Sequence, residues 1–98
     1  MKSNKLLNLR EKLDAIDAKL INLLSKRFAI TRQIGEYKAK NNLPEQDINR
    51  EQEKIEQMQA LAKKLEINKS FIAKLYRLIF DQVVSEHKSL KITSLKVK

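Results

Sequence analysis

The fold is decided by residues 6–37, which read LLNLREKLDAIDAKLINLLSKRFAITRQIGEY. Apolar side chains recur there in steps of three and four, at Leu6, Leu9, Leu13, Ile16, Leu20, Leu23, Ile30, Ile34 and Tyr37. This spacing is typical of the buried face of one long helix, and it continues like the seam of a coiled coil. We predict a helix over residues 5–40, which is about 50 Å long at 1.5 Å per residue.

Two shorter helices follow a break in this pattern. Pro44 disfavours helical geometry at the residue before it, and Asp47 is a favourable N-cap. The apolar spacing then predicts helices over residues 47–64 and 69–90, and we expect residues 91–98 to form a basic tail that frays. With one glycine and one proline in 98 residues, the sequence predicts a single all-α domain of three helices.

The length of the first helix predicts a partner chain. Helices of about 20 residues span about 30 Å, so neither of the shorter helices covers the long one along its whole length. Two copies of the chain solve this problem if their long helices pack together. We therefore predict an intertwined homodimer with C2 symmetry.

Composition excludes several classes of protein. The chain contains no cysteine, which excludes a disulfide scaffold, a thiolate metal site and a cysteine nucleophile. It has no apolar run of about 20 residues that would span a membrane, and its first residues lack the apolar region of a signal peptide. We expect a soluble, cytoplasmic protein. The net charge of +9 indicates a solvated lysine-rich surface, a nucleic-acid partner or an anionic small molecule.

Two ionisable residues occupy positions where the apolar seams require a buried side chain. Arg27 lies on the seam of the first helix, and Glu51 lies on the seam of the second. A buried charge costs several kcal/mol unless it is paired. Either the two residues form a buried ion pair, or both line a polar pocket between helices.

The spacing of further charges favours a pocket. Lys38 follows Arg27 by eleven residues, so both point from nearly the same face, about 16 Å apart. A small dianion between them would meet one cation at each end. Asp47 and Arg50 are neighbours on one face of the second helix, whose first turn offers free N–H groups to an anion. The plainer alternatives are that Asp47 only caps the helix and that Lys38 and Arg50 are solvated surface charges.

These residues lie in an order that resembles the all-helical (AroQ-type) chorismate mutases. The stretches that carry the resemblance are LREKLDAIDAKLINLLSKRFAITRQIGEYK, LPEQDINREQEKIEQ and FIAKLYRLIFDQVV. They resemble in particular the mutase domains of bifunctional phenylalanine- and tyrosine-pathway enzymes. The resemblance implies an intertwined dimer with two active sites, and an isomerase of aromatic amino acid biosynthesis that rearranges chorismate to prephenate. It also implies that no cofactor and no metal is needed, and that neither nucleic acid nor membrane is a partner.

The resemblance also implies a role for each of the charged residues. Arg27 clamps one carboxylate of the substrate, and Lys38 reaches the ether oxygen and a carboxylate. Asp47 and Glu51 hold the substrate hydroxyl, with Glu51 the more important. Arg50 faces the ligand from the second helix.

Arg10 matches an arginine that the family supplies from the other subunit. Arg10 and Arg27 are 17 residues apart on one helix, which is about 25 Å and too far to share one small ligand. If Arg10 contributes to a site, it therefore contributes to the site of the second chain.

The third helix departs from the family pattern at two positions. Aligned without gaps, the family's frequent serine falls on Val83 and its ether-binding glutamine falls on His87. Val83 cannot donate a hydrogen bond, whereas an imidazole can donate through a ring nitrogen. We expect His87 to donate to the ether oxygen; the alternative is an ordinary surface histidine near a fraying helix end. A shift of four residues would instead place His87 on the serine and Lys91 on the glutamine.

Three other functions compete with this interpretation. Isochorismate pyruvate-lyase shares the fold and a similar cationic pocket, although Glu51 and the loop NNLPEQD favour a mutase. A basic helical dimer that binds nucleic acid is compatible with the net charge, but the charges are spread along the chain and no aromatic platform is present. In a purely structural coiled coil, Arg27 and Glu51 would set the register of the helices.

Overall fold

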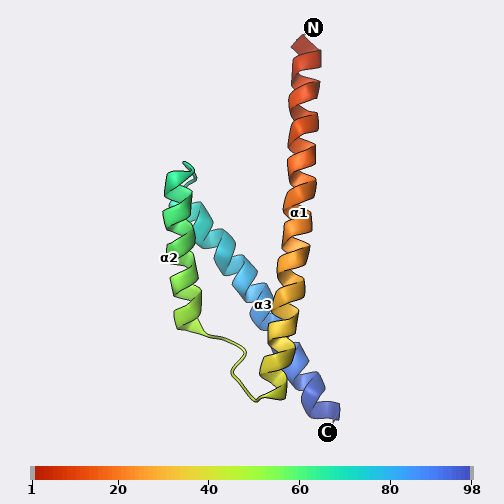
Figure 1. The fold of residues 1–98 in the computed structure, drawn as a ribbon, viewed down its shortest axis with the longest axis vertical. Coiled ribbons are helices and arrows are strands. Elements are labelled where there is room, and N and C mark those ends of the chain that lie inside the picture. Colours follow the sequence, from red (N-terminus) through yellow and green to blue (C-terminus); the bar gives the residue numbers. More distant parts are fainter. Residues whose placement is uncertain (1, 98) are drawn as a thin grey trace. The chain divides into compact units, whose positions relative to one another are not determined.

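The computed structural model describes residues 2–97, with the side chains of residues 4–90. Three helices make up this part of the chain: α1 is Lys2–Lys40, α2 is Ile48–Lys64 and α3 is Lys69–Val97 (Figure 1). No strand occurs within residues 2–97. The prediction of an all-α fold with one long N-terminal helix and two shorter helices is confirmed.

The helix ends differ from the predicted ones mainly towards the two ends of the chain. α1 begins at Lys2 rather than at residue 5. α3 continues to Val97, whereas we expected it to end at residue 90 and to give way to a fraying tail. The sequence of residues 91–97 contains neither glycine nor proline, so no residue there breaks the helix.

The chain divides into two compact units, Met1–Thr31 and Arg32–Lys98. The described part of the first unit is a single stretch of α1. Its seam side chains are 49% to 61% exposed, at Leu6, Leu9, Leu13, Ile16, Leu20 and Leu23. A contiguous exposed apolar face of this kind is typical of an interaction surface.

The second unit contains the end of α1 together with α2 and α3, and its core lies where α2 packs against α3. Among the side chains that the structure describes, the buried apolar ones are Ile55 and Ala62 on α2 and Ala73 and Ile79 on α3. Two of them are alanines, and small side chains at a contact let two helix axes approach closely. A core of this size contributes little stability by itself.

The turn between α2 and α3 satisfies the free backbone groups of both helix ends. Glu66 adopts a left-handed conformation with φ of 59°, and the N–H of Ile67 donates to the carbonyl of Ala62 at 2.8 Å. This arrangement is a Schellman motif. The N–H of Phe71 donates to the Asn68 side chain at 2.9 Å, which caps the first turn of α3.

We predict that Glu66→Gly stabilises the protein by about 1 kcal/mol, because the left-handed conformation is unfavourable for a residue with a β-carbon. For a chain of this size, Tm should rise by roughly 4–8 °C in a thermal unfolding experiment. Asn42→Gly is the matched control, because Asn42 has a similar φ of 55° but asparagine tolerates it better. A gain from Asn42→Gly that equals or exceeds the gain from Glu66→Gly would contradict this explanation.

Candidate active site

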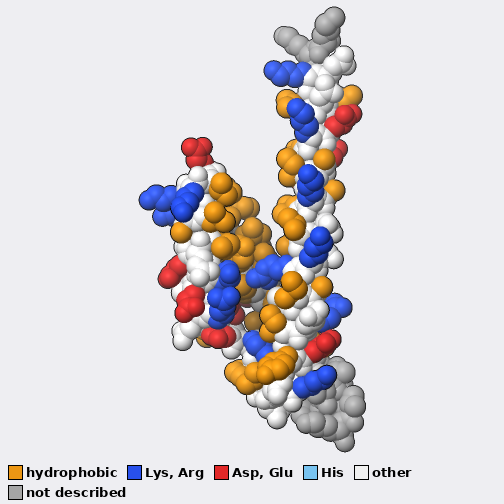
Figure 2. All heavy atoms as spheres, in the orientation of Figure 1, with side chains coloured by type: hydrophobic (Ala, Val, Ile, Leu, Met, Phe, Trp, Pro, Cys, Tyr) orange, Lys and Arg blue, Asp and Glu red, His pale blue; other side chains and the backbone are white. Residues whose placement is uncertain are grey.

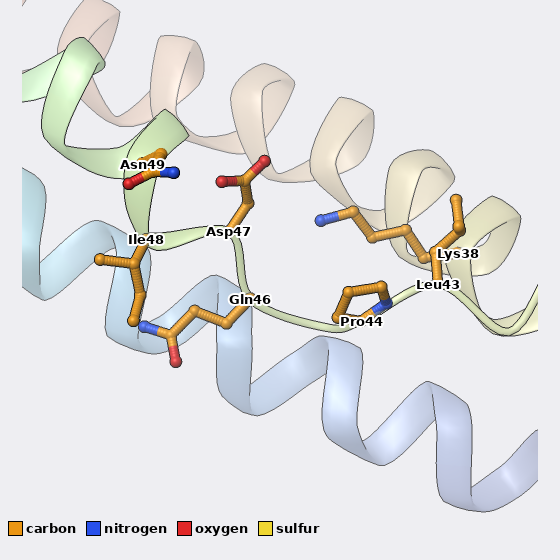
Figure 3. A pocket seen from close by; sticks show the side chains of 7 residues that line it. All are labelled: Lys38, Leu43, Pro44, Gln46, Asp47, Ile48 and Asn49. Carbon is orange, nitrogen blue, oxygen red and sulfur yellow. The ribbon is translucent and has the colours of Figure 1, made fainter.

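A hollow of about 460 Å³ opens at the connection between α1 and α2 (Figure 3). Its volume is in the range that accommodates a small molecule. All of the residues that line it belong to the second unit: Lys38, Leu43, Pro44, Gln46, Asp47, Ile48 and Asn49. Two of the predicted site residues, Lys38 and Asp47, therefore share one hollow.

Lys38 supplies the cation of this hollow from the last turn of α1. The side chain is half-buried, and Figure 3 shows it extending from the helix towards Asp47. The backbone carbonyl of Lys38 accepts a hydrogen bond of 2.9 Å from the N–H of Leu43, and Asn42 between them has a positive φ of 55°. This Schellman motif turns the chain back over Lys38 and builds one wall of the hollow.

Asp47 is the N-cap of α2, as one of the two interpretations of this residue predicted. Its Oδ1 accepts a hydrogen bond of 3.0 Å from the N–H of Arg50. Capping occupies one oxygen, and a carboxylate has two, so the other oxygen remains available to a ligand. The side chain of Arg50 is exposed, and Arg50 is not one of the residues that line the hollow within the described part of the chain.

Glu51 is half-buried in the first turn of α2. Its Oε1 accepts a hydrogen bond of 3.4 Å from Nε2 of Gln46. The N-terminal end of a helix favours acidic side chains, which suits a glutamate at this position. Gln46 thus joins Glu51 to the hollow that contains Lys38 and Asp47.

Gln46 is a candidate site residue that the sequence analysis missed. It lines the hollow near Lys38 and also a second hollow of about 380 Å³ beside α3. The only signal in the sequence is its position directly before the N-cap, which many loop residues share. Its role depends on the path of the loop, so periodicity could not reveal it.

His87 is buried, with only 4% of its surface exposed. The alternative of an ordinary surface histidine is therefore wrong. The reason is a close packing of α3 on the end of α1, where Gly35 leaves room for the imidazole. Val83 lies one turn earlier on α3 and is half-buried.

Arg10 and Arg27 belong to the first unit. Arg10 is exposed, whereas Arg27 is half-buried and its Nη1 atom is inaccessible to solvent. The burial of this guanidinium nitrogen distinguishes Arg27 from the exposed apolar side chains of the seam. The two arginines lie on the same helix, 17 residues apart in the sequence.

The described residues contain no group of three or more His, Cys, Asp or Glu side chains that could hold a metal ion. Nor is any of the helices, where described, both long and apolar enough to cross a membrane. The polar side chains that line the hollow are the ammonium of Lys38, the carboxylate of Asp47 and the amides of Gln46 and Asn49. Such a set can bind a small anion and donate hydrogen bonds to it.

Comparison with known proteins identifies the family. A family model described as chorismate mutase type II matches residues 9–88. The chain is 38% identical over 89% of its length to the bifunctional chorismate mutase/prephenate dehydratase of Buchnera aphidicola subsp. Schizaphis graminum, of which it covers 23%. It is 34% identical over 89% of its length to the enzyme of that name from Escherichia coli K12, of which it covers 22%.

A third relative is more distant in sequence. The chain is 32% identical over 92% of its length to the bifunctional chorismate mutase/prephenate dehydratase of Aquifex aeolicus, of which it covers 26%. The chain thus spans about a quarter of the length of these relatives. Because the family model matches most of the chain, including every position from Arg10 to His87, the protein belongs to the chorismate mutase type II family.

Proposed function

We propose that this protein rearranges chorismate to prephenate in aromatic amino acid biosynthesis. The observation that supports this proposal most directly is the hollow that Lys38 and Asp47 share beside Glu51, in a chain of the chorismate mutase type II family. The relatives are named as bifunctional enzymes that include chorismate mutase.

The chemistry of this rearrangement requires only positioning and charge. One C–O bond of the enolpyruvyl ether breaks while one C–C bond forms, and the electrons are redistributed within a single molecule. No proton, hydride or group has to be transferred to the protein. The enzyme can therefore act by holding the dianion in a reactive chair-like conformer and by stabilising the negative charge that grows on the ether oxygen.

The cations have distinct roles in this proposal. Lys38 lines the hollow and donates to the ether oxygen and to one carboxylate of chorismate. Arg27, which is half-buried on α1, binds a carboxylate through its planar guanidinium. Arg50 is exposed at the start of α2, and it contributes positive potential to the ligand region.

The carboxylates hold the substrate hydroxyl. Asp47 uses Oδ1 for the helix cap and presents Oδ2 to the ligand. Glu51 accepts from Gln46 through one oxygen, so its second oxygen can accept from the hydroxyl. Local hydrogen bonds orient both side chains before the substrate arrives, which reduces the entropy lost on binding.

His87 takes the place of the family's ether-binding glutamine. A ring N–H of the imidazole donates to the ether oxygen, and burial of the side chain strengthens this interaction because the local dielectric is low. Val83 has no polar group and contributes only an apolar wall to the substrate-binding region.

The functional unit in this proposal is an intertwined homodimer with C2 symmetry. The exposed seam of the first unit, from Leu6 to Leu23, supports this state because a second copy carries the same apolar face. Arg10 then acts in the partner's site, since it lies about 25 Å from Arg27 along one helix. Each of the two sites contains residues from both chains.

We predict that Lys38→Gln lowers kcat by about 100-fold to 1,000-fold, the usual effect of removing one donor to a developing oxyanion. The matched control is Lys40→Gln, because Lys40 is in the same last turn of α1 but is exposed. The assay follows the loss of chorismate absorbance and identifies prephenate as the product. If both variants keep wild-type kcat/KM, Lys38 does not act on the ether oxygen. If the folded wild-type dimer forms no prephenate, the proposed function is wrong.

Arg27→Leu separates an enzyme from a structural coiled coil. Replacing a charged seam residue by leucine should leave the dimer at least as stable, because burying a guanidinium carries a desolvation cost. We expect turnover to fall by about 100-fold or more, because a carboxylate of the substrate loses its partner. Thermal unfolding and chorismate turnover are measured on one sample. A stable variant with unchanged turnover would show that Arg27 only sets the register of the helices.

Leu20→Glu tests the homodimer. A carboxylate on the seam opposes burial of that face, so sedimentation equilibrium should show monomers at concentrations where the wild type is dimeric. Ile21→Glu is the control. Ile21 and Leu20 have similar exposed fractions, 64% and 53%, but Ile21 lies off the seam, so its replacement should leave the dimer intact. Dimers of unchanged stability in both variants would contradict the proposed interface.

A further inference from the structure

Gly35 is the only glycine of the chain, and it lies in the interior of α1. Glycine weakens a helix interior because it loses more backbone freedom than any other residue. The φ of Gly35 is not positive, so no left-handed conformation requires glycine at this position. The reason for a glycine must therefore be the space around it.

The space around Gly35 is filled by the third helix. A β-carbon at Gly35 would lie 2.9 Å from Nε2 of His87 and 2.9 Å from Cδ1 of Leu90, and closer still to Cδ2 of His87. Gly35 is itself buried, and His87 is 4% exposed. The Nε2–Cδ2 edge of the imidazole thus occupies the volume that any larger residue at position 35 would need.

The same helix face carries Lys38. Residues three apart on a helix are neighbours, with β-carbons about 5–6 Å apart. The imidazole that lies against Gly35 is therefore one turn away from Lys38 along α1. His87 does not itself line the hollow that contains Lys38, so a ligand that contacts both groups has to reach from this hollow towards the face of α1 that carries Gly35.

We propose that Gly35 is a positioning residue, whose missing side chain seats the His87 imidazole against α1 so that Nε2 and Lys38 serve the same ligand. This inference rests on the proposed function, in which both groups donate to the ether oxygen of chorismate. Gly35 touches no substrate atom in this account and acts only through His87.

Gly35→Ala is the direct test, because it adds only the β-carbon and favours the helix itself. We expect kcat/KM to fall by about 10-fold to 100-fold, mainly through kcat, because a displacement of about 1 Å is enough for such a loss. In the background of His87→Ala, the same change should alter kcat/KM by less than about twofold, since coupled residues are not additive. Equal losses in the two backgrounds would overturn the proposal.

Leu90 provides the control for simple packing. The added β-carbon also meets Cδ1 of Leu90, and Leu90→Ala removes that contact without touching His87. We expect Gly35→Ala/Leu90→Ala to stay impaired. Recovery of wild-type kcat/KM in this double variant would show that the glycine accommodates Leu90, and that it does not position the imidazole.

The single histidine of the chain allows a measurement that does not depend on turnover. The ¹⁵N resonances of its ring report the position and surroundings of the imidazole directly. We expect Gly35→Ala to shift these resonances. Titration with prephenate should move these resonances in the wild type and leave them unmoved in Gly35→Ala. Identical ring spectra for the two proteins would overturn the proposal. If the wild type has no turnover but the ring resonances still differ between wild type and Gly35→Ala, the proposed function is wrong. The positioning of His87 by Gly35 is then still supported.

Whether the variants fold shows which side chain excludes a β-carbon at position 35. If Gly35→Ala does not fold, Gly35→Ala/His87→Ala should fold, because both imidazole atoms that clash have been removed and the remaining contact, Cδ1 of Leu90, is the end of a flexible side chain. Failure of both variants would overturn the proposal, since an element other than the imidazole would then exclude a side chain at position 35.

Discussion

An apolar helix face in contact with water is unfavourable, and α1 keeps such a face from Leu6 to Leu23. Burying the exposed half of one leucine contributes on the order of 1 kcal/mol. Six such side chains together approach the whole stability of a small domain, which is about 5–15 kcal/mol. Up to residue 90, the buried apolar side chains of the second unit are few, and two are alanines. Association through the seam would therefore supply much of the stability, and folding would depend on protein concentration.

At the connection between α1 and α2, some polar atoms stabilise the helix ends, and other polar atoms of the same residues are available to a ligand. Asp47 caps α2 with one oxygen, and Glu51 accepts from Gln46 with one oxygen. The carbonyl of Lys38 closes the end of α1, while its side chain lines the hollow. A site held by helix caps is rigid without ligand, and rigidity of this kind is what electrostatic stabilisation of a transition state requires.

The third helix shows how a departure from a family pattern is accommodated. A histidine is shorter and more rigid than a glutamine, so it needs a different approach to reach the same ligand. In our proposal, burial of His87 against Gly35 provides that approach. Val83, one turn earlier on the same helix, carries no donor, so the proposed mechanism depends more strongly on the placement of His87.

Local signals were sufficient for most of the fold. The three-and-four spacing predicted α1 and α2, and a further apolar pattern predicted α3. Pro44 predicted the break, and Asp47 predicted the start of α2 because N-capping depends on residues only three positions apart. The clearest difference was the end of α3, which continues to Val97. The basic tail was predicted to fray after residue 90, although it contains no helix breaker.

The candidate site, too, could be predicted only in part from the sequence. Lys38, Asp47 and Glu51 could be named from spacing, because neighbours on a helix surface follow from its geometry. The contact between His87 and Gly35 could not, since these residues are 52 positions apart in the sequence and meet only through the packing of α3 on α1. Position along a helix is a local property, whereas burial and the choice of neighbours depend on how the helices pack, which no short stretch of sequence specifies.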